Sequence, residues 1–194
     1  ADEDYQAISD NRFDMNKYPD TKTLRENGFK LATGEGMVFP IVDWNKLSAF
    51  FAGKVTPPMK NYLQQSTLEH TDQAMNDGGF SIPMEQIADR AVFWEKFNQE
   101  HPYFVLTEET SESQRWLLHS LTNGADNTPV FDYETKLVQD EFSKMWKYVL
   151  DKYPGTAAAK RVKEFSELVA AEGGKTSKKV EDMQQKYSGE MLYE

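Results

Sequence analysis

The sequence predicts an all-α fold made of stacked antiparallel helical hairpins or an irregular bundle, with about seven to nine helices. Strand candidates are limited to residues 37–42 and 103–106, which are too short and isolated to make a sheet of their own. Aromatic residues make up 13% of the chain, which favours a packed core over disorder. Helix-start signals recur at regular intervals, at Pro57, Ser81, Thr107, Asp132, Thr156 and Ser177.

Boundary residues define the helices of the first half of the chain. Asp43 is expected to cap a helix over residues 44–51, and the prolines at 57 and 58 open a second helix that runs to about residue 76. Ser81 is expected to open a third helix, which His101-Pro102 stops.

The same signals divide the second half. Thr107, with acidic residues in the first turn, opens a helix that ends near Gly124. Asp132 is expected to cap the next helix, which ends at Tyr153-Pro154. Thr156 opens an Ala-rich helix, and Ser177 opens the last.

Phe93-Trp94 precedes His101-Pro102 at the same offset at which Met145-Trp146 precedes Tyr153-Pro154. The match fits a repeat of two helices, and a chance match fits it equally well.

Length and composition indicate one domain over residues 1–194, with an Asp-rich segment over residues 1–20 that we expect to be loosely ordered. The net charge of −10 argues against a nucleic-acid partner, and no apolar run is long enough for a membrane span. With no cysteine, disulfides and thiolate metal sites are excluded. The start at Ala1-Asp2, without methionine, resembles the mature end of an exported protein and suggests a secreted, periplasmic or cell-surface location.

One short stretch carries a resemblance. Residues 152–162, Lys-Tyr-Pro-Gly-Thr-Ala-Ala-Ala-Lys-Arg-Val, look like the Tyr-Pro and Ala-rich junction of bacterial exported proteins with a tetratricopeptide-like (TPR-like) fold. Among such proteins, the Hus-type haemophores of Bacteroidetes are similar in size and helicity. The resemblance implies close packing of consecutive helices, haem or porphyrin as bound ligand, and an outer-membrane receptor as a candidate partner.

The predicted helix that contains His70 offers the first candidate site. Met59, Leu63 and His70 share one face at helical spacing, and Tyr62 borders it. The face has few large aliphatic residues, which is typical of a helix that lines a groove. Met59 and Tyr62 would contact a planar apolar ligand, and His70 would be the haem iron ligand. A half-exposed helix with a surface histidine explains the same pattern.

Further candidate ligand-binding residues lie later in the chain. Phe80 follows a double glycine, and Tyr103 and Phe104 follow a proline in a short connection, so these aromatic rings are candidates for a stacking surface. Trp116 and His119 lie one helical turn apart, with His119 on a stripe of polar residues that we expect to be solvated.

The leading hypothesis is a non-catalytic binding protein that captures a hydrophobic planar ligand such as haem. The alternative is a helical scaffold that binds a peptide or protein partner in a groove. A third hypothesis is a glycan-directed hydrolase that uses the carboxylates of Glu35 and Asp43.

Overall fold

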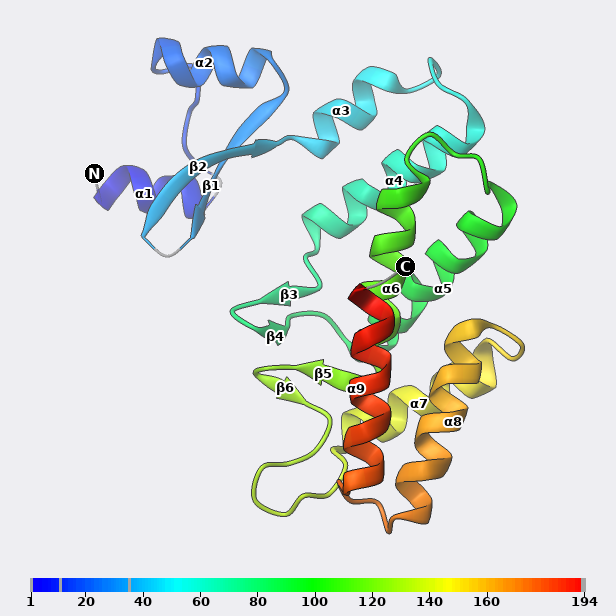
Figure 1. Cartoon of the computed structure of the whole chain (residues 1–194). Helices are drawn as coiled ribbons and strands as arrows, with labels where there is room; N and C mark the ends of the chain where they lie inside the picture. The colour runs from blue at the N-terminus through cyan, green and yellow to red at the C-terminus, as the bar shows by residue number, and fades with distance from the viewer. Residues whose placement is uncertain (1, 11, 35, 193–194) are drawn as a thin grey trace. The chain divides into compact units, whose positions relative to one another are not determined.

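A computed structural model describes residues 2–10, 12–34 and 36–192 of the chain. These residues contain nine α-helices and three two-stranded antiparallel sheets (Figure 1). Because the strands are few and short, the all-α prediction is confirmed. The chain forms two compact units, Ala1–Asp72 (unit 1) and Gln73–Glu194 (unit 2). From the sequence we expected a single domain. No signal in the sequence indicated a division into two units.

Unit 1 consists of short helices and one β-hairpin. Helices α1 and α2 pack against strand β1, and α3 packs against α4. Helix α1 lies in the N-terminal segment for which we expected loose order. The bounds are α1 (Asp2–Ser9), α2 (Pro19–Glu26), β1 (Phe29–Gly34), β2 (Met37–Val42), α3 (Trp44–Phe51) and α4 (Pro57–Thr71).

The strand predicted over residues 37–42 is confirmed as β2, but it is not isolated as we expected. It pairs with β1 along its whole length, with Phe29 opposite Val42. The N–H of Asp43 donates to the carbonyl of Gly28 at 2.8 Å, so every second N–H group along β2 points toward β1 and the others point away from it. Pro40 is at a position that points away from β1. Because proline has no N–H, the free edge of β2 lacks a hydrogen-bond donor there. That edge is therefore a poor template for a further strand.

Unit 2 contains the same order of elements twice, each time a β-hairpin followed by two helices, and then a last helix. Helix α5 packs against α6, α7 and α8, and α9 packs against α6 and α8. Trp94 on α5 and Trp146 on α7, the pair that suggested a repeat, are both buried. The bounds are β3 (Met75–Asn76), β4 (Gly79–Phe80), α5 (Met84–Glu100), α6 (Thr107–Asn123), β5 (Gly124–Ala125), β6 (Thr128–Pro129), α7 (Asp140–Lys152), α8 (Ala157–Ala171) and α9 (Lys178–Leu192).

Two predicted helix starts are wrong. Helix α7 begins at Asp140, because the carboxylate of Asp132 accepts hydrogen bonds from the N–H groups of Glu134 (3.1 Å) and Thr135 (2.7 Å) and closes a turn instead. Helix α5 begins at Met84, because the Ser81 hydroxyl donates to the carbonyl of Gln73 and caps no helix.

The strand predicted over residues 103–106 is also wrong. The N–H of Phe104 donates to the carbonyl of His101, and the N–H of Thr107 donates to the carbonyl of Phe104, both at 3.0 Å. These local bonds close consecutive turns instead of leaving the backbone extended as in a strand.

The junction between α7 and α8 depends on small side chains and on a buried acid. Ala158 and Ala159 are buried, which allows the close helix packing that the resemblance implied. The buried carboxylate of Glu95 accepts hydrogen bonds from the N–H groups of Ala157 (2.7 Å) and Ala158 (3.3 Å). An acid from α5 therefore caps the N-terminus of α8. The finer TPR-like arrangement stays a prediction.

Candidate functional site

The two hairpins of unit 2 touch each other and bring two helix starts to one place. The N–H of Asn127 donates to the carbonyl of Gly78 at 2.8 Å, and the N–H of Phe80 donates to the Thr128 hydroxyl at 3.0 Å. The N–H of Gln139 donates to the carbonyl of Val130 at 2.9 Å, which holds the start of α7 beside β6. The N-termini of α5 and α7 consequently lie near the paired hairpins (Figure 1).

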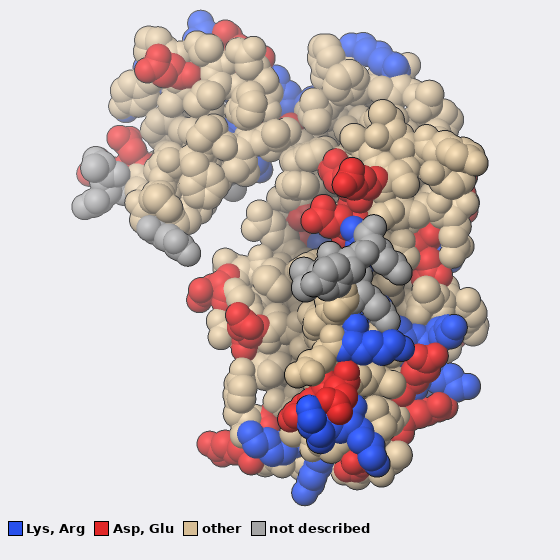
Figure 2. Space-filling model, in the orientation of Figure 1, with Lys and Arg blue, Asp and Glu red and all other residues tan. Residues whose placement is uncertain are grey.

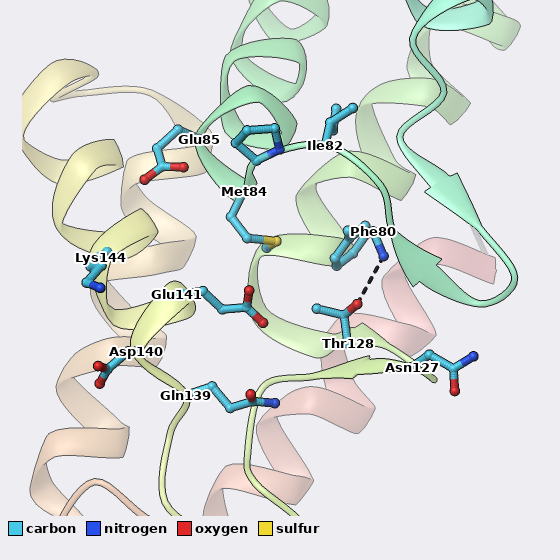
Figure 3. A pocket seen from close by; sticks show the side chains of 11 residues that line it. Phe80, Ile82, Met84, Glu85, Asn127, Thr128, Gln139, Asp140, Glu141 and Lys144 are labelled. Atoms are coloured by element: carbon cyan, nitrogen blue, oxygen red, sulfur yellow. Dashed lines mark hydrogen bonds between the residues drawn. The ribbon is translucent and has the colours of Figure 1, made fainter.

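An open hollow of about 610 Å³ lies between these hairpins and helix starts (Figure 3). Its volume falls within the range of about 300–1,000 Å³ that is usual for small-molecule sites. The lining residues come from both hairpin–helix modules: Phe80, Ile82, Pro83, Met84 and Glu85 from the first, and Asn127, Thr128, Gln139, Asp140, Glu141 and Lys144 from the second.

The hollow has an aromatic end and a charged end. Figure 3 shows Phe80 and Thr128 on one side and Glu85 and Lys144 on the opposite side. Met84 and Glu141 lie between them, with the sulfur of Met84 directed toward the Phe80 ring. A ligand that fills the hollow would thus meet an apolar surface at one end and charges at the other.

Phe80 is held in place from two sides. Its backbone is fixed by the hydrogen bond to Thr128, and its ring meets the ring of Trp116 edge to face, with centroids 6.5 Å apart. The ring is only half-buried. An aromatic surface that is rigid before binding loses little conformational entropy when a ligand stacks on it.

The charged groups of the hollow are not paired with one another. Within the described part of the chain, Glu85, Asp140, Glu141 and Lys144 have neither an ion pair nor a hydrogen-bond partner for their side chains. The amide of Gln139, in contrast, is fixed by a 2.6 Å hydrogen bond to the carbonyl of Pro129. Three carboxylates and one ammonium group are available to a ligand.

Figure 2 shows acidic and basic side chains interspersed over the visible face of unit 2, with no continuous basic area there. No group of three or more His, Asp or Glu side chains in the described ranges is placed to hold a metal ion. The described helices include none with both the length and the apolar character to cross a membrane.

The predicted site residues of unit 1 separate into buried and exposed positions. Tyr62 and Leu63 are buried, although we predicted that they line an open groove. Large apolar side chains gain more free energy by packing in the interior than by facing water. Met59 is half-buried and His70 is exposed. His70 stacks on Trp44, with ring centroids 4.5 Å apart.

In unit 2 the structure brings together two of the predicted residues, Phe80 and Trp116. Of the predicted residues, Phe80 lines the hollow, and Trp116 supports it from behind without lining the hollow itself. Tyr103 is 97% exposed at the α5–α6 connection, and Phe104 packs edge to face on Phe97. His119 is half-buried between α6 and α9 rather than on a solvated stripe, because its Nε2 meets the Ser188 hydroxyl at 3.1 Å.

Neither residue of the hydrolase hypothesis is among those that line the hollow. Glu35 is outside the described residues. The carboxylate of Asp43 accepts a hydrogen bond from the N–H of Lys46 at 3.1 Å and caps α3, as its position in the sequence predicted.

Sequence reasoning missed Met84, Glu85, Thr128 and Glu141. We assigned neither Glu85 nor Glu141 a role in a site, since acids in the first turn of a helix are favoured there without any ligand. No local pattern shows that two helix starts face the same hollow, since their approach depends on contact between the hairpins.

No protein-family model, curated protein or solved structure matches the chain.

Proposed function

We propose that the chain is a non-catalytic binding protein that takes a small organic ligand in the hollow of unit 2. The observation that carries the proposal is the half-buried, rigidly supported ring of Phe80 beside Met84 in a hollow of about 610 Å³. Aromatic and thioether groups offer flat, polarisable contacts to an apolar ring. This agrees with the sequence-based expectation of a planar apolar ligand.

A titration with 2-phenylethanol tests the proposal. We expect saturable binding with a Kd on the order of 1 mM, as a fragment of this size allows. The Phe80→Ala variant should bind about two- to tenfold more weakly, since one aromatic pair contributes about 0.5–1.5 kcal/mol. Trp116 touches Phe80, so tryptophan fluorescence and amide NMR shifts can follow the titration.

Tyr133→Ala serves as the control, because Tyr133 is an exposed aromatic residue of the same unit that does not line the hollow. Affinity should be unchanged in this variant. A response that fails to saturate up to about 10 mM, or that is equal in Phe80→Ala and the native protein, would show that the hollow is not the site.

Haem binding through His70 is a second candidate function, favoured by one observation. The Nδ1 of His70 lies 2.8 Å from the carbonyl of Ser66, to which it can donate a proton. This tautomer leaves Nε2 as an acceptor, which is the arrangement that orients a histidine toward a metal. The adjacent Trp44 adds a flat ring next to the imidazole.

Titration of the full chain with haem, followed at the Soret band, tests this candidate. We expect a saturable spectral shift that His70→Ala abolishes and His101→Ala leaves intact. Helical circular dichroism should be the same in both variants. An unaltered shift in His70→Ala would exclude this histidine as the iron ligand.

A further inference from the structure

The charged end of the hollow indicates which class of ligand it takes. We propose that the ligand is an organic cation: an ammonium or guanidinium group attached to an apolar, preferably aromatic, body. This inference rests on the proposed function of the hollow and names the chemistry of its ligand.

Both hairpin–helix modules contribute an acid to the hollow from equivalent positions. Glu85 is the second residue of α5, and Glu141 is the second residue of α7. Acids in the first turn of a helix are stabilised by its positive N-terminal end, so the fold tolerates two of them near each other. Together with Asp140 they give the hollow three negative charges against the one positive charge of Lys144, or 3 − 1 = 2 net negative charges.

These carboxylates are available for a ligand. No hydrogen bond or ion pair occupies the side chains of Glu85, Asp140 and Glu141 within the residues that the structure describes. They do not converge on one point as the ligands of a metal ion would. Carboxylates that are spread around a hollow suit a group with several N–H donors, such as an ammonium or a guanidinium.

The distance between the two ends determines how the ligand would lie. Phe80 and Thr128 are on one side of the hollow, and Glu85 and Lys144 are on the other, with Glu141 between them (Figure 3). An aromatic ring stacked on Phe80 would direct an attached amine toward Glu141 and Glu85. Lys144 would repel that amine. It is the one cationic side chain among the described residues of the lining that could receive an acid.

Three probes share a phenyl ring and differ in charge. Together they test the preference for a cation separately from binding in the hollow. We expect 2-phenylethylamine to bind the 194-residue chain about fivefold more tightly than 2-phenylethanol, because it can form two partly exposed ion pairs. The acid 3-phenylpropionate should bind most weakly of the three. Amide NMR shifts at Phe80, Thr128 and Glu141 give the Kd and the location. The preference for the amine should decrease as the salt concentration rises.

Variants assign the preference to particular side chains. Glu85→Gln and Glu141→Gln should each reduce the advantage of the amine about twofold, and the double variant should remove it. Glu112→Gln makes the same change of charge on an exposed residue of α6 outside the hollow and should have no effect. Lys144→Gln should increase the advantage of the amine.

The outcomes distinguish the two proposals. Equal affinity for the amine and the alcohol would overturn the cation inference and leave the proposed function standing. Absence of binding by all three probes would overturn both proposals.

A blocked Phe-Lys dipeptide also combines an aromatic ring with an ammonium group. Tighter binding of the dipeptide than of 2-phenylethylamine would assign the cation to a peptide side chain, and the reverse order would assign it to a free amine.

Discussion

At the scale of single residues, His119 shows how packing changes the behaviour of a titratable group. Burial between α6 and α9 lowers the pKa of His119 below its usual 6.5, and the charge of Arg161 on α8 lowers it further. The Ser188 hydroxyl, which contacts the imidazole, also accepts a hydrogen bond from the amide of Asn123 at 3.1 Å. A neutral imidazole is therefore part of the contact between these helices.

This lowered pKa predicts a loss of stability in mild acid. In the unfolded chain His119 takes up a proton near pH 6.5, whereas in the folded protein it does so only at lower pH. The neutral histidine therefore contributes its full stabilisation of the folded state above pH 6.5. It is lost as the pH falls from 6.5 toward the folded-state pKa. The melting temperature, measured by circular dichroism, should fall between pH 7.5 and 5.5, and it should fall less in His119→Gln.

Carboxylates do not mask this effect, because their window lies at lower pH. Burial, the largest single influence, raises the pKa of Asp89, but hydrogen bonds from Tyr153, Tyr148 and Lys152 outweigh it and bring the pKa below 3.8. The contribution of the Asp89 carboxylate to the stability of the fold is therefore lost only in stronger acid. An identical pH dependence in His119→Gln and the native protein would contradict the assignment to His119.

At the scale of elements, the second hairpin of unit 2 depends on one glycine. Gly124 ends α6 and begins β5 with φ of +71°, a backbone conformation that L side chains rarely adopt. A Cβ at this position would lie 2.6 Å from the carbonyl oxygen of Thr128 and 3.0 Å from the nitrogen of Val130. The hairpin that forms one wall of the hollow needs this close approach of two backbones.

Gly124→Ala should therefore destabilise the protein by at least about 1–3 kcal/mol, the usual cost of such strain. Gly189→Ala is the matched control, since Gly189 lies within α9 with no atom within 4 Å of its added Cβ. Gly189→Ala should stabilise the folded protein by about 0.5–1 kcal/mol. Chemical denaturation measures both effects, and a neutral effect of Gly124→Ala would mean that the hairpin relaxes without cost.

At the scale of the whole molecule, the charge of the chain and the charge of the hollow have the same sign. The net charge of −10 attracts cations over distances of about a Debye length, roughly 8–10 Å at physiological salt. A cationic ligand would be drawn toward the protein before it meets the hollow, whereas the carboxylates of a haem would be repelled. The charge therefore favours the organic cation among the ligands considered.

The sequence by itself determined helices α3 to α9 and most of their ends, whereas α1 and α2 were not predicted. Local signals suffice there, because a cap such as Asp43 or Thr156 bonds to an N–H only three residues away. Such signals failed at Asp132, where the same type of side chain closes a turn, since turn and helix start use one local hydrogen-bond pattern.

Only the tertiary structure decided which residues form the candidate site. Phe80 and Thr128 meet through the contact of two hairpins. Glu85 and Glu141 reach one hollow because each lies in the first turn of the helix that follows its hairpin. Burial likewise separated Tyr62, in the interior, from His70, at the surface of the same helix. Helix formation is governed by neighbours within about four residues along the chain, whereas a binding site depends on long-range packing, which no local pattern encodes.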